Sequence, residues 1–185
     1  PPKGNPNTGF HSINQDAYLA FGAITSRFLR ADFSCVGYSG KGVYRNFDKS
    51  EEETLPKIYS MLYPNAGLEK EYDFSFNPHL IVIKIGTNDF GAEMGDFPDM
   101  TDSSRFVTTY LKFLQFVTQK NPQAKIVLAV GGGLTDYYPQ GLQRLSRYKS
   151  WVKSVLLEAE KNYSNTFGFF EFQPQNPPYG EDWHP

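Results

Sequence analysis

Residues 79–90 read H-L-I-V-I-K-I-G-T-N-D-F, and the prediction of the fold starts from this stretch. Residues 80–85 form an aliphatic, mostly β-branched run that one lysine interrupts. Such a run is typical of a strand buried on both faces of a parallel sheet, although a short apolar run alone does not exclude a helix. We expect Gly86 to end this strand.

Three small polar residues, Thr87, Asn88 and Asp89, then stand at the carboxyl end of the strand. Ligands of open α/β sheets bind in the crevice outside the carboxyl ends of the strands, so these side chains are well placed for chemistry. The alternative is structural, because such residues also cap strands and begin turns. These residues by themselves leave both interpretations open.

The rest of the chain alternates predicted helices with predicted strands. The helices are expected at residues 13–29 (with Asn14 or Asp16 as the N-cap), 51–62, 103–119 and 141–162, and the strands at residues 32–38, 80–85, 125–130 and 166–172. This alternation is the signature of βαβ units with right-handed crossovers. It predicts one α/β domain over residues 1–185, a flavodoxin-like three-layer α/β/α sandwich with a mostly parallel sheet and residues 80–85 as its central strand.

Composition excludes several classes of protein. Charged residues are 21% and hydrophobic residues 39% of the 185-residue chain, so it is not disordered by composition. A net charge of −2 without a basic cluster gives no footprint for nucleic acid or for a membrane surface, and no run of 18 apolar residues is present. The single cysteine, Cys35, excludes an internal disulfide and is expected to be a small buried side chain in the 32–38 strand. Three scattered histidines do not predict a metal site.

Three elements have the chemistry of a hydrolytic site. The glycine-rich turn at residues 39–42 can present a backbone N–H without obstruction by a side chain. Asn88 can donate from its amide, and His184, which follows acidic residues, can act as a general base. Each feature alone has a structural alternative: a turn, a cap and a solvated histidine.

The joint order of these elements is more specific, and it carries a resemblance. The chain reads Y-S-G-K-G-V-Y-R-N at residues 38–46, G-T-N-D-F at residues 86–90 and D-W-H-P at residues 182–185. These blocks resemble those of SGNH-type (GDSL-like) serine esterases, and within that group the catalytic domain of carbohydrate esterase family 2. The resemblance extends over essentially the whole chain and implies the SGNH hydrolase fold.

The resemblance also implies roles for individual residues. By it, the backbone N–H of Gly40, with Gly42 as the other choice, and the side-chain amide of Asn88 would bind the oxyanion. His184 would deprotonate the nucleophile, without a metal or an organic cofactor. Removal of one oxyanion donor typically lowers kcat by about 10²–10³.

Further residues are expected around these. Asp182, Glu181 or a backbone carbonyl would orient the histidine. Trp183 is expected to stack on a sugar ring rather than only to pack in the core. Gly42 and Asp89 are predicted to be substrate-binding residues. Asp89 is expected to act as a hydrogen-bond partner behind Asn88 rather than as a catalyst. Tyr44 and Arg45 are expected to line the edge of the site.

The resembled family places its nucleophilic serine in a G-D-S block ahead of the first helix, and this chain has no such block. We therefore expect the first strand and the serine to lie upstream of residue 1, so that a chain without them would be poorly stable because of its exposed strand edges. Ser39 is the alternative nucleophile, although Lys41 then stands where a G-x-S-x-G elbow needs glycine.

The function that the resemblance implies is hydrolysis of O-acetyl groups on plant cell-wall carbohydrate of the xylan or mannan type, by a serine acyl-enzyme mechanism. The implied partner is an acetylated polysaccharide or oligosaccharide, with no nucleic acid and no membrane. Proteins of this kind are secreted and often carry a β-sandwich domain in front. The main alternative is a non-catalytic carbohydrate-binding module on the same scaffold, and a weaker one is a lipid or thioester hydrolase.

Overall fold

The computed structural model describes residues 9, 11–12, 16–64, 70–94 and 99–173. The chain divides into two compact units, one made of Pro1–Gly37 with Gln173–Pro185 and one made of Tyr38–Phe172. The larger unit contains the sheet and the sequence blocks at residues 38–46 and 86–90.

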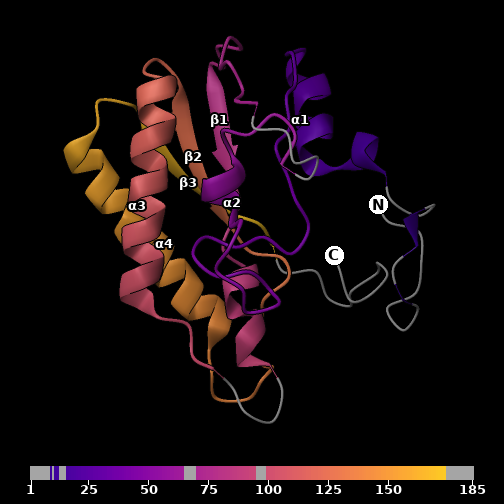
Figure 1. Ribbon diagram of the computed structural model, residues 1–185, viewed down its shortest axis with the longest axis vertical. Coiled ribbons are helices and arrows are strands. Elements are labelled where there is room, and N and C mark those ends of the chain that lie inside the picture. Colours follow the sequence, from indigo (N-terminus) through magenta and orange to yellow (C-terminus); the bar gives the residue numbers. More distant parts are fainter. Residues whose placement is uncertain (1–8, 10, 13–15, 65–69, 95–98, 174–185) are drawn as a thin grey trace. The chain divides into compact units, whose positions relative to one another are not determined.

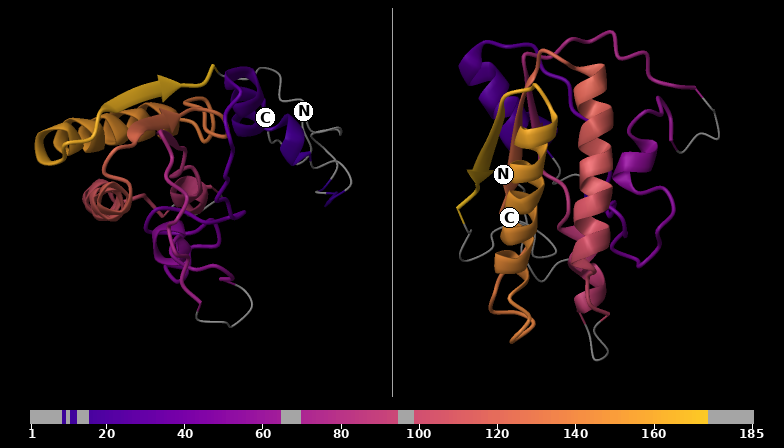
Figure 2. Two further views of the ribbon diagram at one scale, coloured as in Figure 1. Left: turned by 90° about the horizontal axis from the view of Figure 1, so that it is seen from above. Right: turned by 90° about the vertical axis from the view of Figure 1, so that its left-hand side faces the viewer.

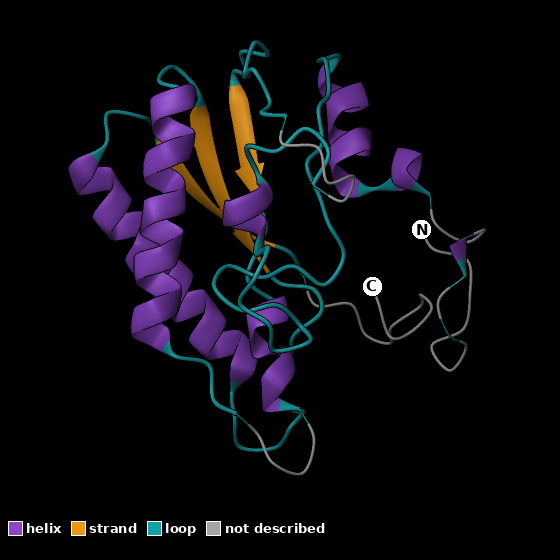
Figure 3. Cartoon of the chain, in the orientation of Figure 1, coloured by secondary structure: helices purple, strands orange, loops and turns teal. Residues whose placement is uncertain are grey.

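The larger unit is built on a parallel sheet of three strands, β1 (Leu80–Ile83), β2 (Lys125–Val130) and β3 (Phe167–Glu171). The order β1-β2-β3 follows the sequence, and both strand pairs are parallel, as the apolar runs predicted (Figures 1 and 3). The α/β fold class with a parallel sheet is therefore confirmed.

The two long helices connect these strands. The α3 helix (Ser103–Lys120) joins β1 to β2, and α4 (Arg144–Asn162) joins β2 to β3. Because both right-handed crossovers step in the same direction along the sheet, both helices lie on the same face of it (Figures 1 and 2). The larger unit thus supplies two of the three layers of the predicted sandwich.

The face of the sheet that meets these helices forms the core. Its side chains align in rows across the three strands: Ile81 beside Ile126 and Phe167, and Ile83 beside Leu128 and Phe169. The helices contribute fully buried aromatic and aliphatic residues, namely Phe106, Tyr110, Leu114, Val117, Tyr148, Val152 and Val155. Burial of this apolar surface is the main stabilising term, at about 25 cal/mol per Å².

Two expectations for residues 80–85 were wrong. Leu80 and Val82 are 44% and 43% exposed, so β1 is buried on only one face. β1 is also an edge strand of the described sheet, and β2 is the central one. An apolar β-branched run reports β-propensity, but it does not identify which neighbours cover each face.

The N-terminal unit also differs from the sequence-based prediction. The helix predicted at residues 13–29 is divided into a 3-10 turn (Ala17–Leu19) and α1 (Phe21–Leu29), because Ala20 between them is extended. Asp16 does act as an N-cap, since its carboxylate accepts from the N–H groups of Tyr18 and Leu19. Asn14 lies outside the described residues.

The strand predicted at residues 32–38 is absent, and these residues form a loop (Figure 3). Cys35 is exposed rather than buried. A β-strand requires a partner for its backbone N–H and C=O groups, and the ladders among the described residues join only β1, β2 and β3.

Two short helices lie next to the sequence blocks at residues 38–46 and 86–90. The helix predicted at residues 51–62 contracts to α2 (Leu55–Ile58), where Pro56 occupies the first turn, a position that needs no N–H donor. The polar residues after β1 start a 3-10 helix, η3 (Asn88–Glu93). None of the helices in the described part of the chain has the length and apolar character that a membrane span requires.

We predict that Gly86→Ala lowers the free energy of unfolding by about 3 kcal/mol. Gly86 has φ +120°, and a Cβ there would lie 2.8 Å from ring atoms of Phe106 and Tyr148. Gly141→Ala is the matched control, since Gly141 also has positive φ (+82°) but no atom within 4 Å of the added Cβ. Gly141→Ala should lower the free energy of unfolding by only about 1 kcal/mol. Equal losses of unfolding free energy in the two variants, measured by urea unfolding, would contradict the steric argument.

Candidate active site

The carboxylate of Asp89 holds the glycine-rich loop against η3. Asp89 is fully buried, and its two oxygens accept the N–H groups of Val43 (2.7 Å), Tyr44 (2.9 Å) and Arg45 (3.1 Å). Only a side chain with two acceptor oxygens and no donor satisfies three converging N–H groups. The sequence blocks at residues 38–46 and 86–90 are therefore joined by one side chain.

Burial dominates the electrostatics of this carboxylate. Removal from water raises the pKa of Asp89 to about 6, although the three backbone N–H groups favour its ionised form. Its full burial leaves no surface for a substrate. The geometry thus favours a role for Asp89 in holding the loop over direct contact with substrate.

The structure distinguishes between the two glycines considered as oxyanion donors. The N–H of Gly42 donates to Oδ1 of Asn46 at 3.1 Å, and a Cβ at Gly42 would lie 1.9 Å from the carbonyl oxygen of Arg45. Gly42 is therefore buried and its donor is occupied. By contrast, the N–H of Gly40 has no acceptor among the described residues, and Gly40 has φ +77° with open space where a Cβ would stand.

Asn88 lies beside the same loop. Its Nδ2 donates to the carbonyl oxygen of Lys41 at 2.9 Å, next to Gly40 in the chain. A primary amide carries two N–H donors, so this bond fixes the side chain and leaves its second hydrogen for a ligand. The structure therefore holds the Asn88 amide against the glycine-rich loop that contains Gly40, and their role as oxyanion donors stays a prediction.

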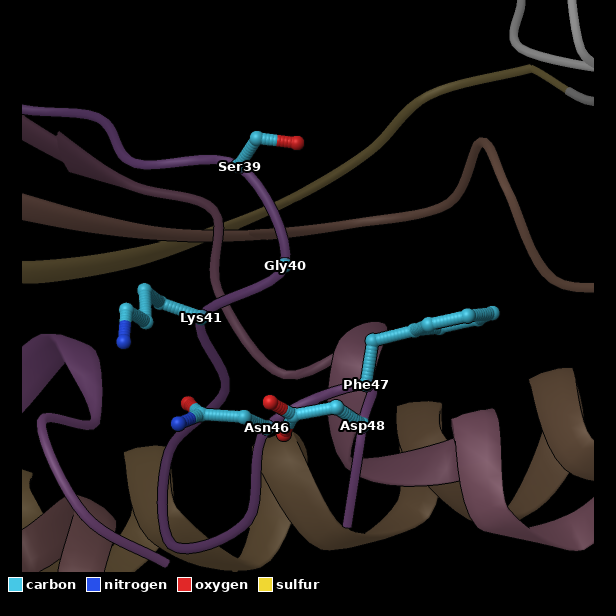
Figure 4. Close-up of a pocket in the computed structure, with 6 residues that line it drawn as sticks. All are labelled: Ser39, Gly40, Lys41, Asn46, Phe47 and Asp48. Carbon is cyan, nitrogen blue, oxygen red and sulfur yellow. The ribbon is translucent and has the colours of Figure 1, made fainter. Parts of the chain in front are cut away.

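An open depression of about 160 Å³ lies over this loop, lined by Ser39, Gly40, Lys41, Asn46, Phe47 and Asp48 (Figure 4). The Ser39 side chain points away from Lys41 and Asn46 (Figure 4). The Phe47 ring is 51% exposed and rests on Gly91, where a Cβ would lie 2.6 Å from the ring. An exposed, fixed aromatic face therefore borders Gly40.

Arg45 and Tyr44 do not line the edge of the site, which corrects the sequence-based expectation. Arg45 is 5% exposed, and its guanidinium donates to the Asp89 carbonyl (3.0 Å), the Asp99 carboxylate (2.8 Å) and Oγ1 of Thr101 (3.2 Å). The buried Tyr44 hydroxyl accepts the N–H of Asp102 at 2.9 Å. Both are supports behind the loop, because an arginine in a motif does not reveal which side of a loop it occupies.

Sequence reasoning missed a second support. Glu93, at the end of η3, is fully buried and accepts from both terminal nitrogens of Arg147, at 2.8 and 2.9 Å. It also accepts the N–H of Thr101 at 2.8 Å, and Thr101 in turn donates its hydroxyl to the Asp89 carbonyl at 3.1 Å. No short-range pattern in the sequence marks this pair, because its members are 54 residues apart.

The remaining predicted site residues, Asp182, Trp183 and His184, lie outside the described residues, as does Glu181. Among the residues that are described, no three His, Cys, Asp or Glu side chains come together as potential metal ligands. The described part of the candidate site thus consists of hydrogen-bond donors and their supports.

Comparison with known proteins identifies relatives of the chain. No protein-family model matches it. It is 31% identical over 189 residues to the cellulase/esterase CelE of Acetivibrio thermocellus, a match that covers 98% of this chain and 22% of CelE. It is 26% identical over 172 residues to an acetylxylan esterase / glucomannan deacetylase of Cellvibrio japonicus, which covers 92% of this chain and 44% of that protein. The chain spans less than half the length of these curated relatives.

A solved structure agrees with this result. A family two carbohydrate esterase from Clostridium thermocellum in complex with cellohexaose matches with a TM-score of 0.86 at 29% identity, over 100% of this chain and 53% of that one. The fold and relatives of the chain are those of carbohydrate esterases. In particular, the chain resembles carbohydrate esterase family 2 along essentially its whole length, which confirms the resemblance seen in the motifs.

We predict that the stability supplied by Asp89 depends on pH. A folded-state pKa of about 6, above the ordinary 3.8, means that this contribution is fully present below pH 3.8 and is lost as pH rises through 6. From pH 4.5 to 7.5, the unfolding free energy of the wild type should fall by about 2 kcal/mol relative to that of Asp89→Asn, measured by urea unfolding.

Asp48→Asn provides the control for this measurement. Hydrogen bonds from Ser50 lower the pKa of the exposed Asp48 carboxyl below 3.8, so its titration lies under the range tested. The difference between the wild type and Asp48→Asn should stay constant. A constant difference for Asp89→Asn as well would contradict the burial argument.

Proposed function

We propose that this chain is the larger part of a single esterase domain that removes O-acetyl groups from plant cell-wall polysaccharide of the xylan or mannan type. One observation carries the proposal: the N–H of Gly40 has no acceptor within the described part of the chain, and the amide of Asn88 is fixed on the carbonyl of the adjacent Lys41, just after the carboxyl end of β1. Two converging donors of this kind suit the oxyanion of acyl transfer. The acetylxylan esterase activity named for a relative supports the choice of substrate.

The proposed mechanism proceeds through an acyl-enzyme. A serine upstream of residue 1 attacks the acetyl carbonyl carbon while His184 takes its proton, and Gly40 and Asn88 donate to the oxyanion. The tetrahedral intermediate expels the sugar oxygen, which receives the proton from His184. Water, activated by His184, then releases acetate. Asp182, or alternatively Glu181 or a backbone carbonyl, holds the imidazole in the required tautomer.

Aromatic side chains are the proposed contacts of the sugar rings. Trp183 stands beside the base in the sequence. Phe47 borders Gly40 with half of its surface exposed, and Tyr137 is 89% exposed in the loop that follows β2. Flat apolar faces of this kind match the C–H faces of sugars. The proposed setting is a secreted protein that meets its polymer outside the cell, with a β-sandwich domain in front.

A second candidate function is that of a non-catalytic module that binds polysaccharide without hydrolysis. A specific observation favours it, because the similar family two esterase was solved with cellohexaose bound. The two candidates differ in the nucleophile. A serine in a G-D-S block upstream of residue 1 would support the esterase. Another residue in place of that serine, in a protein that keeps Trp183, would support the binding module.

The first experiment is intact mass spectrometry of the purified protein, followed by a p-nitrophenyl acetate assay. Activity in a protein heavier than 21.0 kDa that is lost in His184→Ala supports the proposal. Absence of turnover in such a protein, together with retained binding of the polymer, supports the module. Turnover that disappears in Ser39→Ala would show that the nucleophile has been misassigned.

We predict that Asn88→Ala lowers kcat by about 10²–10³ with little change in KM, since the amide acts on the oxyanion and not on the ground-state ester. Asn77→Ala is the matched control, because the amide of this exposed asparagine donates to the Ser75 carbonyl two residues before it and to no other described residue. Steady-state kinetics on an acetate ester measures both variants. Unchanged kcat in Asn88→Ala would remove Asn88 from the site.

A further inference from the structure

The turn that leads from β1 to Asn88 rests on two aromatic rings. A Cβ at Gly86 would meet Cζ of Phe106 and Cε2 of Tyr148, both at 2.8 Å, so the backbone of Gly86 lies directly on these rings. Phe106 and Tyr148 are fully buried and meet edge-on, with centroids 6.2 Å apart. A close-packed interior transmits a displacement of either ring to the turn.

The hydroxyl of Tyr148 acts where the ladder between β1 and β2 ends. The last paired residues are Ile83 and Leu128. Beyond them, the Tyr148 hydroxyl donates to the Ile85 carbonyl at 2.7 Å and lies 3.5 Å from the Ala129 carbonyl. Tyr148 therefore ties β1 to β2 at the point where the parallel strands begin to separate and ligands of α/β proteins bind.

This hydroxyl remains a donor under ordinary conditions. Burial raises the pKa of Tyr148 far above its usual 10, and the nearby Asp89 carboxylate acts in the same direction. The phenol thus stays protonated across the pH range in which the protein is folded. A buried carbonyl that loses its hydrogen-bond donor lowers the free energy of unfolding by about 1–3 kcal/mol. The hydrogen bond from Tyr148 to the Ile85 carbonyl therefore strongly restrains the end of β1.

We propose that Tyr148 is a positioning residue for the oxyanion donor Asn88, a role that rests on the function proposed above. Its hydroxyl fixes the Ile85 carbonyl and its ring supports Gly86, two residues before Asn88. The Asn88 amide itself donates to the Lys41 carbonyl, at 2.9 Å. Tyr148 sets the backbone from which Asn88 reaches the oxyanion, and it touches no substrate.

The same core provides a matched control in Tyr110. This tyrosine is also fully buried and also packs edge-on against Phe106, with centroids 5.8 Å apart. Its hydroxyl has no hydrogen-bond partner within the described part of the chain. Removal of the two hydroxyls therefore changes burial alike, but only Tyr148→Phe releases the Ile85 carbonyl.

The test compares Tyr148→Phe with Tyr110→Phe in two measurements. Acetate-ester kinetics should show kcat lowered about tenfold with unchanged KM in Tyr148→Phe, because a donor displaced by a fraction of an ångström loses contact mainly with the transition state. Tyr110→Phe should keep the wild-type kcat. In ¹⁵N–¹H NMR spectra, the Asn88 side-chain amide signal, assigned with Asn88→Ala, should shift or broaden only in Tyr148→Phe.

A purely structural role gives a different result. It would lower the melting temperature of Tyr148→Phe but leave kcat and the Asn88 amide signal as in Tyr110→Phe, and this outcome would overturn the proposal. Absence of turnover in the wild type means that the proposed hydrolysis has failed. The Asn88 signal then decides alone, and identical spectra of the two variants would overturn the positioning role.

Discussion

Three hydrogen bonds from consecutive backbone N–H groups to the Asp89 carboxylate hold the candidate site together. Hydrogen bonds to a charged group contribute about 1.5–3 kcal/mol each, and here they oppose the cost of removing a carboxylate from water. That cost appears in the raised pKa of Asp89. Because the carboxylate consumes the N–H groups of residues 43–45, the loop is fixed with Gly40 at its outer end. The orientation of the donors thus depends on a side chain that meets no ligand.

The backbone carbonyl of Asp89 is one end of a network that reaches α4. Arg45 and Thr101 both bind the Asp89 carbonyl, Thr101 also binds Glu93, and Glu93 holds Arg147. Removal of one partner from a buried ion pair typically costs 3–5 kcal/mol, because the other charge is left without compensation. The loops over the sheet are therefore fixed by charge and hydrogen bonding, while the sheet and helices below them are fixed by apolar packing. This division matches the general arrangement of a rigid scaffold that positions functional loops.

Much of this arrangement could be predicted from local patterns, and the errors have a common cause. The strands at residues 125–130 and 166–172, the helix at residues 103–119 and the parallel order follow from apolar period and length, which are properties of a single segment. The central position expected for residues 80–85 and the strand expected at residues 32–38 depend on which segment lies beside which. Pairing is a long-range property, and a β-branched run has the same appearance at the edge and at the centre of a sheet.

The sequence alone indicated the resemblance to carbohydrate esterases. The resemblance lies in the order of three blocks, the glycine-rich turn, G-T-N-D-F and D-W-H-P, and it is confirmed by the relatives and by the fold. The sequence also predicted that Asn88 would follow β1. Only the tertiary structure showed that the N–H of Gly42 is already occupied, because its acceptor, the Asn46 side chain, is positioned by the fold of the loop. Likewise, only the tertiary structure revealed the buried positions of Arg45 and Asp89 and the contact between Tyr148 and the end of β1. The physical reason is that hydrogen-bond availability depends on atoms brought together from distant parts of the chain.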